Sequence, residues 1–127
     1  MLKVTPILLV EEIEPCLPFW VDRLGFEKTV EVPHDGRVGF VILNRGNVEI
    51  MYQSRASVAA DLPILADFAT PGSTVLYIGV SNIEEIETSM ADLEPAIPMR
   101  QTTYGAAEIG FREPAGNVVI FNMQAGY

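Results

Sequence analysis

The sequence has little of what most metal, redox and nucleophilic sites require. It contains one cysteine, Cys16, and one histidine, His34. A single cysteine cannot form an internal disulfide, so a reducing cytoplasm is the expected location. A single histidine excludes any metal motif built from a His pair of this chain. The sequence also lacks a Gly-x-Ser-x-Gly nucleophile motif and a phosphate-binding loop.

Basic residues and long apolar runs are also scarce. Eight Lys and Arg stand against 17 Asp and Glu, which gives a net charge of −9. The basic residues are scattered, and nucleic acid needs clustered ones, so we expect no nucleic-acid partner. No apolar run reaches the ~18 residues of a membrane span, and the first residues show no signal-peptide pattern, so we expect no membrane partner. The acidic balance favours a cationic ligand over an anionic one.

The main positive feature is an internal repeat. Residues 46–51, Gly-Asn-Val-Glu-Ile-Met, return 70 positions later as residues 116–121, Gly-Asn-Val-Val-Ile-Phe. The same offset carries the apolar run 7–10 onto residues 77–80. Each half therefore begins with an apolar strand and ends with a turn followed by a strand, and the same 70-residue offset relates both segments. The chain is predicted to consist of two tandem copies of one structural module.

Local patterns predict the same elements in both halves, with Pro and Gly clusters as turns. In the first half we expect strands at 2–10, 26–32, 38–43 and 48–53, and a helix from Glu14 that Gly25 stops. In the second half we expect strands at 74–80, 98–103, 106–112 and 118–123, and a helix capped by Asn82 that Pro95 ends. In the connector, Leu62, Leu65 and Phe68 suggest a short helix that Pro63 makes irregular.

These elements predict an α+β fold of two tandem βαβββ modules. We expect a single domain over residues 1–127, with a first module at 1–53, a connector at 54–73 and a second module at 74–127.

The order of these motifs resembles the vicinal oxygen chelate superfamily, which includes glyoxalase I, extradiol dioxygenases and bleomycin-resistance proteins. The first helix carries Phe19-Trp20 ahead of Leu24-Gly25-Phe26, similar to the family's Phe-Tyr then Leu-Gly-Phe pattern. The last hairpin, residues 113–117, reads Glu-Pro-Ala-Gly-Asn and resembles the family's Asp-Pro-Asp-Gly-Asn. The resemblance covers the whole chain and implies two curved half-barrel sheets that form a pocket.

The resemblance also implies where a divalent ion would be held in metal-dependent members. Those places are the start of each module's first strand, here Thr5 and Val75, and the fourth strand of each module, here Glu49 and Val119 or Ile120. Only Glu49 is a carboxylate, and a catalytic metal site usually has about three protein ligands. We therefore expect no metal and no cofactor, similar to the metal-free bleomycin-resistance branch.

Glu49 is the one candidate catalytic residue. It alternates with Val48 and Ile50, so it is expected to face the pocket, where burial would raise its pKa and suit it to general-base work or to pairing with a cationic ligand. A solvent-exposed Glu paired with an arginine is the alternative. His34 lies in a Pro-His-Asp-Gly turn, where exposure is expected.

The remaining candidate pocket residues lie on first and fourth strands. Tyr77 beside Gly79 is a possible stacking platform for a planar ligand, with plain packing as the alternative. Asn122 is a candidate hydrogen-bonding group. The full set of expected ligand-binding residues is Thr5, Ile7, Met51, Tyr77, Gly79, Ile120 and Asn122.

Two functions follow from the resemblance. The first is a protein that binds a small organic ligand, cationic by the charge argument, in a metal-free pocket. The second is a metal-dependent lyase, dioxygenase or epimerase with an atypical or inter-chain metal site. A homodimer is implied because family members commonly pair modules between chains and half-barrels leave strand edges uncovered. The sequence leaves open whether the modules close on each other or on a partner's.

Overall fold

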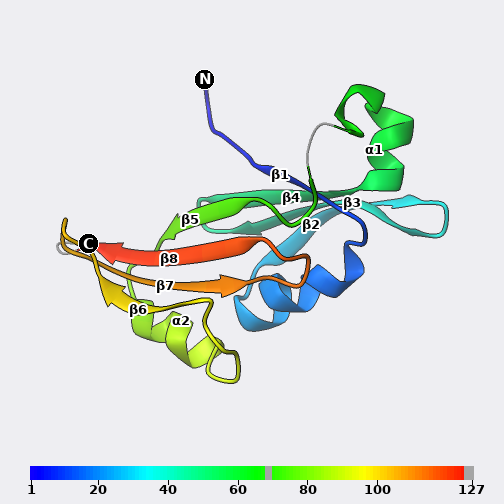
Figure 1. The fold of residues 1–127 in the computed structure, drawn as a ribbon. Helices are drawn as coiled ribbons and strands as arrows, with labels where there is room; N and C mark the ends of the chain where they lie inside the picture. The colour runs from blue at the N-terminus through cyan, green and yellow to red at the C-terminus, as the bar shows by residue number, and fades with distance from the viewer. Residues whose placement is uncertain (68–69, 125–127) are drawn as a thin grey trace.

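The computed structural model describes residues 1–67 and 70–124, which form two four-stranded sheets with short helices (Figure 1). The first sheet has the order β1-β4-β3-β2 and the second β5-β8-β7-β6, with the first pair of each parallel and the others antiparallel. The first sheet consists of β1 (Ile7–Val10), β2 (Glu27–His34), β3 (Arg37–Arg45) and β4 (Val48–Ser54). The second consists of β5 (Val75–Gly79), β6 (Ile97–Gln101), β7 (Ala106–Arg112) and β8 (Val118–Gln124). The two tandem modules of the predicted α+β fold are thus confirmed.

The repeat holds most closely at the last strand of each module. Strand β4 spans residues 48–54 and β8 spans residues 118–124, so their bounds differ by the 70 positions found in the sequence. Gly46 and Gly116, which precede these strands, both have positive φ, which glycine adopts without strain. The same turn therefore starts the same strand twice.

The first strand is shorter than predicted. We expected a strand over residues 2–10, but β1 begins at Ile7. Pro6 has no N–H to donate to a strand ladder, and only its carbonyl bonds to Met51 N, at 3.0 Å. Residues 1–4 therefore leave the sheet and extend away from the body of the protein (Figure 1).

The first helix is not a regular α-helix. It consists of a 3₁₀ turn, η1 (Glu14–Cys16), followed by a π turn, η2 (Pro18–Arg23). Two prolines, Pro15 and Pro18, remove N–H donors that an α-helix would use, so the turns tighten and then widen. Gly25 follows with φ +70°, as its predicted role at the helix end requires.

The connector forms its helix earlier than predicted. Helix α1 (Arg55–Asp61) starts directly after β4, with the Ser54 side chain capping Ser57 N, and a 3₁₀ turn, η3 (Pro63–Leu65), follows. Ser54 is a good N-cap that the sequence interpretation missed, and it places the helix before Pro63. Phe68 lies outside the described residues.

In the second module, helix α2 (Ile83–Ser89) has the predicted cap. The Asn82 side chain accepts a hydrogen bond from Glu84 N at 3.1 Å. Helix α2 and the η1–η2 segment lie on one side of the sheets, and α1 lies on the other (Figure 1). One side of each sheet is therefore covered by the helices of its own module.

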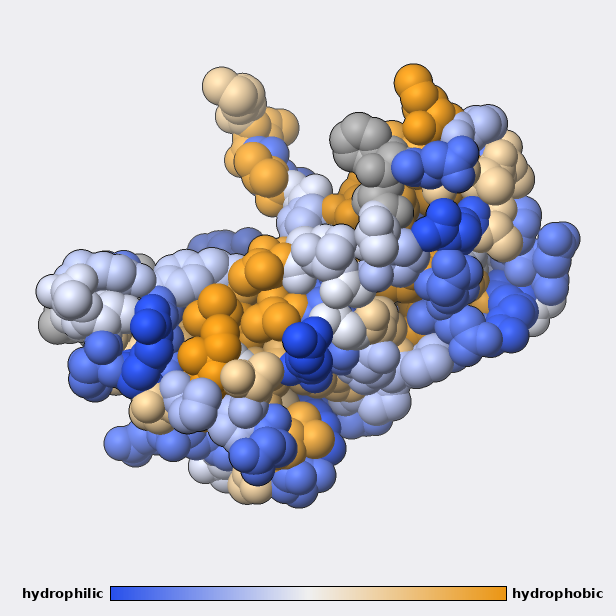
Figure 2. All heavy atoms as spheres, viewed as in Figure 1, coloured by the Kyte–Doolittle hydropathy of each residue, from blue (hydrophilic) through white to orange (hydrophobic). Residues whose placement is uncertain are grey.

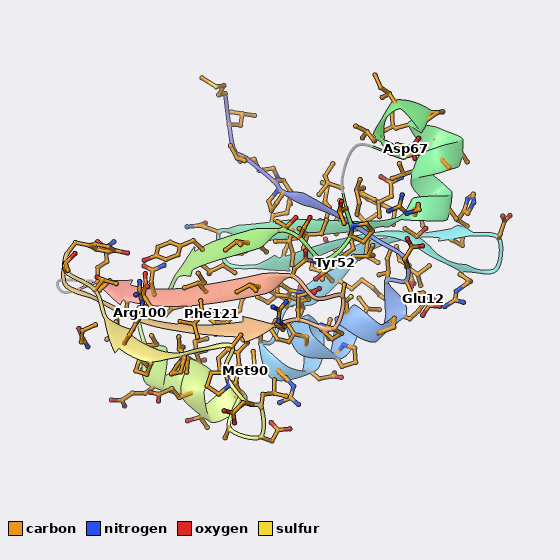
Figure 3. The ribbon with its side chains drawn as sticks, viewed as in Figure 1. Glu12, Tyr52, Asp67, Met90, Arg100 and Phe121 are labelled. Atoms are coloured by element: carbon orange, nitrogen blue, oxygen red, sulfur yellow. The ribbon has the colours of Figure 1, made fainter. Side chains whose placement is uncertain are left out.

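A single core joins the two modules on this covered side. In the first module Trp20 packs edge-on against Phe19 and Phe26, and in the second Ile86, Phe111 and Phe121 belong to the same cluster. The indole of Trp20 donates to Tyr52 Oη at 2.9 Å, and Tyr52 donates to the carboxylate of Glu113 from the second module. Tyr52 lies where the two sheets meet (Figure 3).

Candidate functional site

The opposite side of both sheets is open, and apolar side chains gather there. Strand alternation sends Leu8, Ile50 and Tyr52 into the core, so Ile7 and Met51, which pair with each other, face the open side. The open face of the first sheet includes Ile7, Leu9, Glu27, Val30, Val32, Phe40, Ile42, Asn44, Glu49, Met51 and Gln53. The exposure of these apolar groups marks the face as a binding or contact surface.

One end of this face forms a cavity beneath α1, which we call the cup. It has a volume of about 610 Å³. Its lining residues are Ile7, Val32, Pro33, His34, Phe40, Met51, Gln53, Ser57, Ala60, Asp61 and Leu62. The volume lies within the ~300–1,000 Å³ of ordinary ligand pockets. Two predicted ligand-binding residues, Ile7 and Met51, are therefore in one cavity.

Glu49 faces the open side as predicted, but its protonation differs from the expectation. Its carboxylate oxygens contact Lys3 Nζ at 2.9 Å, Thr5 Oγ1 at 2.8 Å and Asn44 Nδ2 at 2.9 Å. The hydrogen bonds from Lys3, Asn44 and Thr5 lower the pKa of Glu49 to about 2. The predicted rise in its pKa is therefore wrong, because three donors outweigh partial burial. A carboxylate of such low pKa is a weak general base.

Glu49 and Tyr77 line one groove although they belong to different modules. The groove has a volume of about 270 Å³ and runs between the segment before β1, the start of β4 and strand β5. Gly79 lies in it as well. The structure thus brings together three residues that the sequence analysis named separately.

The open face of the second sheet carries a buried carboxylate. Glu108 is only 3% exposed, accepts hydrogen bonds from Tyr77 and from Tyr104 (2.9 Å), and bonds to Arg100 Nε at 3.1 Å and Nη2 at 3.0 Å. The Tyr77 hydroxyl is the main cause of the lowered pKa of Glu108, and the same bond raises the pKa of Tyr77. The carboxylate is ionised and neutralised by Arg100, which lies at the β6 end of this sheet (Figure 3).

The two remaining predicted residues occupy this second face. Ile120 is half-buried and pairs with Tyr77 and Gly110 on the neighbouring strands. Asn122 pairs with Gly79 and Glu108 but is only 2% exposed. These two residues and Tyr77 lie on the second sheet, and Ile7 and Met51 lie on the first.

The residues present do not fit the superfamily's metal site. Thr5 and Glu49 do come together, which supports the assignment of their positions, but Thr5 donates its hydroxyl to the Glu49 carboxylate. Val75 and Ile120 offer no ligand atom. Over residues 1–67 and 70–124, no three His, Cys, Asp or Glu side chains form a group that could hold a metal ion.

The sequence analysis missed several polar residues of the open side. Gln53 could have been found, because it continues the alternation of Glu49 and Met51 along β4. Asp61 could not, because the position of α1 over the sheet is a tertiary feature. Glu108 is buried and bonds to Arg100, whereas Arg112, on the same strand, bonds to Gly116 O. His34, expected to be exposed, lines the cup and is 27% exposed.

The fold is that of the glyoxalase/bleomycin-resistance/dioxygenase proteins of the vicinal oxygen chelate superfamily, as the sequence resemblance indicated. A bleomycin-binding protein from bleomycin-producing Streptomyces verticillus, solved with copper(II)-bleomycin, matches with a TM-score of 0.66 and 26% identity over 100% of this chain and 98% of that one. A glyoxalase/bleomycin resistance protein/dioxygenase from Nocardioides matches with a TM-score of 0.73 and 18% identity over 100% of this chain and 87% of that one. A lactoylglutathione lyase from Agrobacterium tumefaciens matches with a TM-score of 0.76 and 17% identity over 97% and 94% of the two chains.

No protein-family model matches the sequence, and no curated protein matches it. Among the described residues, no helix is long and apolar enough to cross a membrane. The solved structures named above include a bleomycin-binding protein and a lyase, so the fold alone does not choose between the two functions.

Proposed function

We propose that this protein binds a small organic ligand on its open sheet faces without a metal ion. The observation that carries the proposal is the cup, an apolar cavity of about 610 Å³ with a polar end. Glu49, the single carboxylate among the superfamily's metal positions, is already neutralised by Lys3 and bonded to Thr5. The structural similarity to a bleomycin-binding protein supports a binding role, and the net charge of −9 supports a preference for cationic ligands.

We also propose that two chains form a homodimer that covers the open faces. The support is the position of the exposed large apolar residues, most of which fall into three groups. They lie before β1 (Met1, Leu2, Val4), after α1 (Leu62, Ile64) and on the open faces (Ile7, Val30, Val32, Val75, Tyr77). Figure 2 shows apolar surface along the N-terminal segment, over β5 and β8, and at the tip beyond α1. Exposed apolar surface of this kind is typical of protein contacts.

A cytoplasmic location belongs to the same proposal. Its support is that Cys16 is buried and that burial raises the pKa of its thiol to about 12. Such a thiol is inert and has no other cysteine of the chain to pair with.

The binding proposal is tested by calorimetric titration with bleomycin and with naphthalene-bodied compounds of different charge. We expect binding that Met51→Trp weakens, because the larger ring occupies part of the cup. Met99→Trp, on exposed β6, is the matched control and should bind as the unchanged protein does. Equal binding by Met51→Trp and the unchanged protein would place the ligand elsewhere.

Metal analysis of the purified protein separates the two functions. We expect less than a stoichiometric amount of any divalent ion. A stoichiometric ion would contradict the metal-free proposal and favour a metal-dependent lyase, dioxygenase or epimerase.

A further inference from the structure

The polar end of the cup contains a carboxylate that has no Lys or Arg partner among the described residues. Glu49 is paired with Lys3, and Glu108 is paired with Arg100. Asp61, the last residue of α1, lines the cup, and no Lys or Arg of residues 1–67 and 70–124 lies within ion-pair distance of it. We propose that Asp61 and Gln53 form a subsite for the ammonium group of an amine ligand. This inference rests on the proposed binding function and names its ligand class.

Gln53 supplies the second observation. It is 5% exposed, and its amide nitrogen donates to Ser57 Oγ at 3.1 Å and to Asp61 Oδ2 at 3.5 Å. Within the described part of the chain, no hydrogen bond reaches the oxygen of this side-chain amide, Oε1. Among the described residues, the fully enclosed side-chain atoms that lack a hydrogen-bond partner are Glu14 Oε1 and Asn117 Nδ2. The side-chain oxygen of Gln53 is not one of them, so it is not fully enclosed. Since Gln53 lines the cup, its unused acceptor is open to the cavity, where a ligand N–H would satisfy it.

The position of Asp61 has no explanation in helix stability. The C-terminal end of a helix carries partial negative charge, which disfavours an acidic residue there. Asp61 is nevertheless the C-terminal residue of α1 and accepts only the long bond from Gln53. A carboxylate and a carbonyl oxygen that converge on one cavity suit an ammonium group, which has three donors and no acceptor.

The rest of the cup defines the body of the ligand. Its floor is made by the apolar side chains of Ile7, Val32, Phe40 and Met51. Burial of an apolar body on this floor supplies affinity, and the polar end fixes orientation. The ligand class is therefore an amine with an apolar body.

The test compares three compounds with one body: naphthalen-1-ylmethylamine, naphthalen-1-ylmethanol and 1-naphthoate. Their charges at pH 7 are positive, zero and negative. We expect the amine to bind about tenfold more tightly than the alcohol in calorimetric titrations, since a charge-assisted hydrogen bond is worth roughly this factor. We expect the naphthoate to bind weakest.

Asp61→Asn should reduce the amine-to-alcohol preference to within about twofold. Asp61 is exposed, so the variant is expected to fold. Asp22→Asn, an exposed residue of η2, changes the net charge equally and should keep the full preference. Gln53→Leu should also weaken amine binding, and Asp61→Asn remains decisive if that variant does not fold.

Two results would overturn the inference in distinguishable ways. If the amine and alcohol bind equally, or if Asp61→Asn keeps the preference, the subsite is absent but the binding function stands. If none of the three compounds binds and bleomycin does not bind either, the proposed function fails and the subsite fails with it.

Discussion

At the residue scale, Tyr52 is the point at which the two modules depend on each other. Its hydroxyl accepts from the Trp20 indole and donates to Glu113, and Glu113 also accepts from Asn117 N at 2.7 Å. Tyr52 and Trp20 are fully buried and Glu113 is 2% exposed. Every polar atom of this chain of bonds therefore depends on its neighbour, because water cannot replace a lost partner.

Tyr52→Phe is expected to lower the free energy of unfolding by about 1 to 3 kcal/mol, because it leaves the Trp20 N–H and one oxygen of the Glu113 carboxylate, Oε2, without a partner. Urea denaturation followed by tryptophan fluorescence measures the change. Tyr104→Phe removes a hydroxyl from a residue that is 63% exposed and should cost less, since water reaches it. Equal losses of unfolding free energy for the two variants would show that the buried hydrogen bonds of Tyr52 contribute no more to stability than an exposed one.

Glu49 gives a prediction about pH. Its pKa is about 2 in the folded protein against an ordinary value of 4.5, so its contribution to stability is complete above pH 4.5 and is lost as the pH falls towards 2. The difference in unfolding free energy between the unchanged protein and Glu49→Gln should therefore shrink over this range. Glu87→Gln, at an exposed position of α2, removes the same charge at a site without the three donors of Glu49 and is the matched control. A Glu49→Gln difference that grows as the pH falls would mean that the Glu49 pKa is raised after all.

At the element scale, the helices are short and depend on their caps and packing. Helix α2 has seven residues and would not be stable alone, but Ile83 and Ile86 pack into the shared core. Its acidic first turn and the Asn82 cap both stabilise the N-terminal end of the helix.

Asn82→Ala should lower the free energy of unfolding by about 1 kcal/mol, because Glu84 N loses its side-chain acceptor. Thermal and urea denaturation measure this loss. Asn82→Ser keeps a capping oxygen and should retain most of the stability. If alanine and serine are equivalent at this position, the cap does not contribute to the fold.

The bounds of some helices and strands were predicted more accurately from the sequence than those of others. The strands from the hairpins were placed within about two residues, because turns such as Asp35-Gly36, both with positive φ, require specific residues that can be recognised locally. Strand β1 and the first helix were misjudged at Pro6 and Pro18, where a missing N–H stops a ladder or widens a turn. Helix α1 was placed too late because its cap, Ser54, is also the last residue of β4.

At the scale of the whole molecule, the modules share one covered core and leave their other faces open. The bidentate pair of Arg23 and Asp92, at 2.5 and 2.8 Å, and the pair of Arg45 and Glu85 also join the two modules. The open faces, by contrast, carry apolar side chains such as Val75, which is 61% exposed. A partner chain would cover this surface.

Light scattering at micromolar concentration is expected to give twice the mass of one chain. Val75→Asp should give the mass of a single chain with unchanged folding, because the charge would be buried in the interface but is solvated in the monomer. Met99→Asp, on β6, should remain dimeric. A single-chain mass for the unchanged protein would contradict the dimer.

The sequence by itself determined the repeated architecture and the absence of the superfamily's usual ligand set, because strand alternation, turn chemistry and residue identity are local properties. The resemblance to the superfamily assigned Thr5 and Glu49 to metal-ligand positions, and the structure brings these two side chains together. Only the tertiary structure decided the charge state of Glu49, the burial of Glu108 and the position of α1 over the cup. Those properties depend on which distant side chains come within a few ångströms, and no local pattern encodes such contacts.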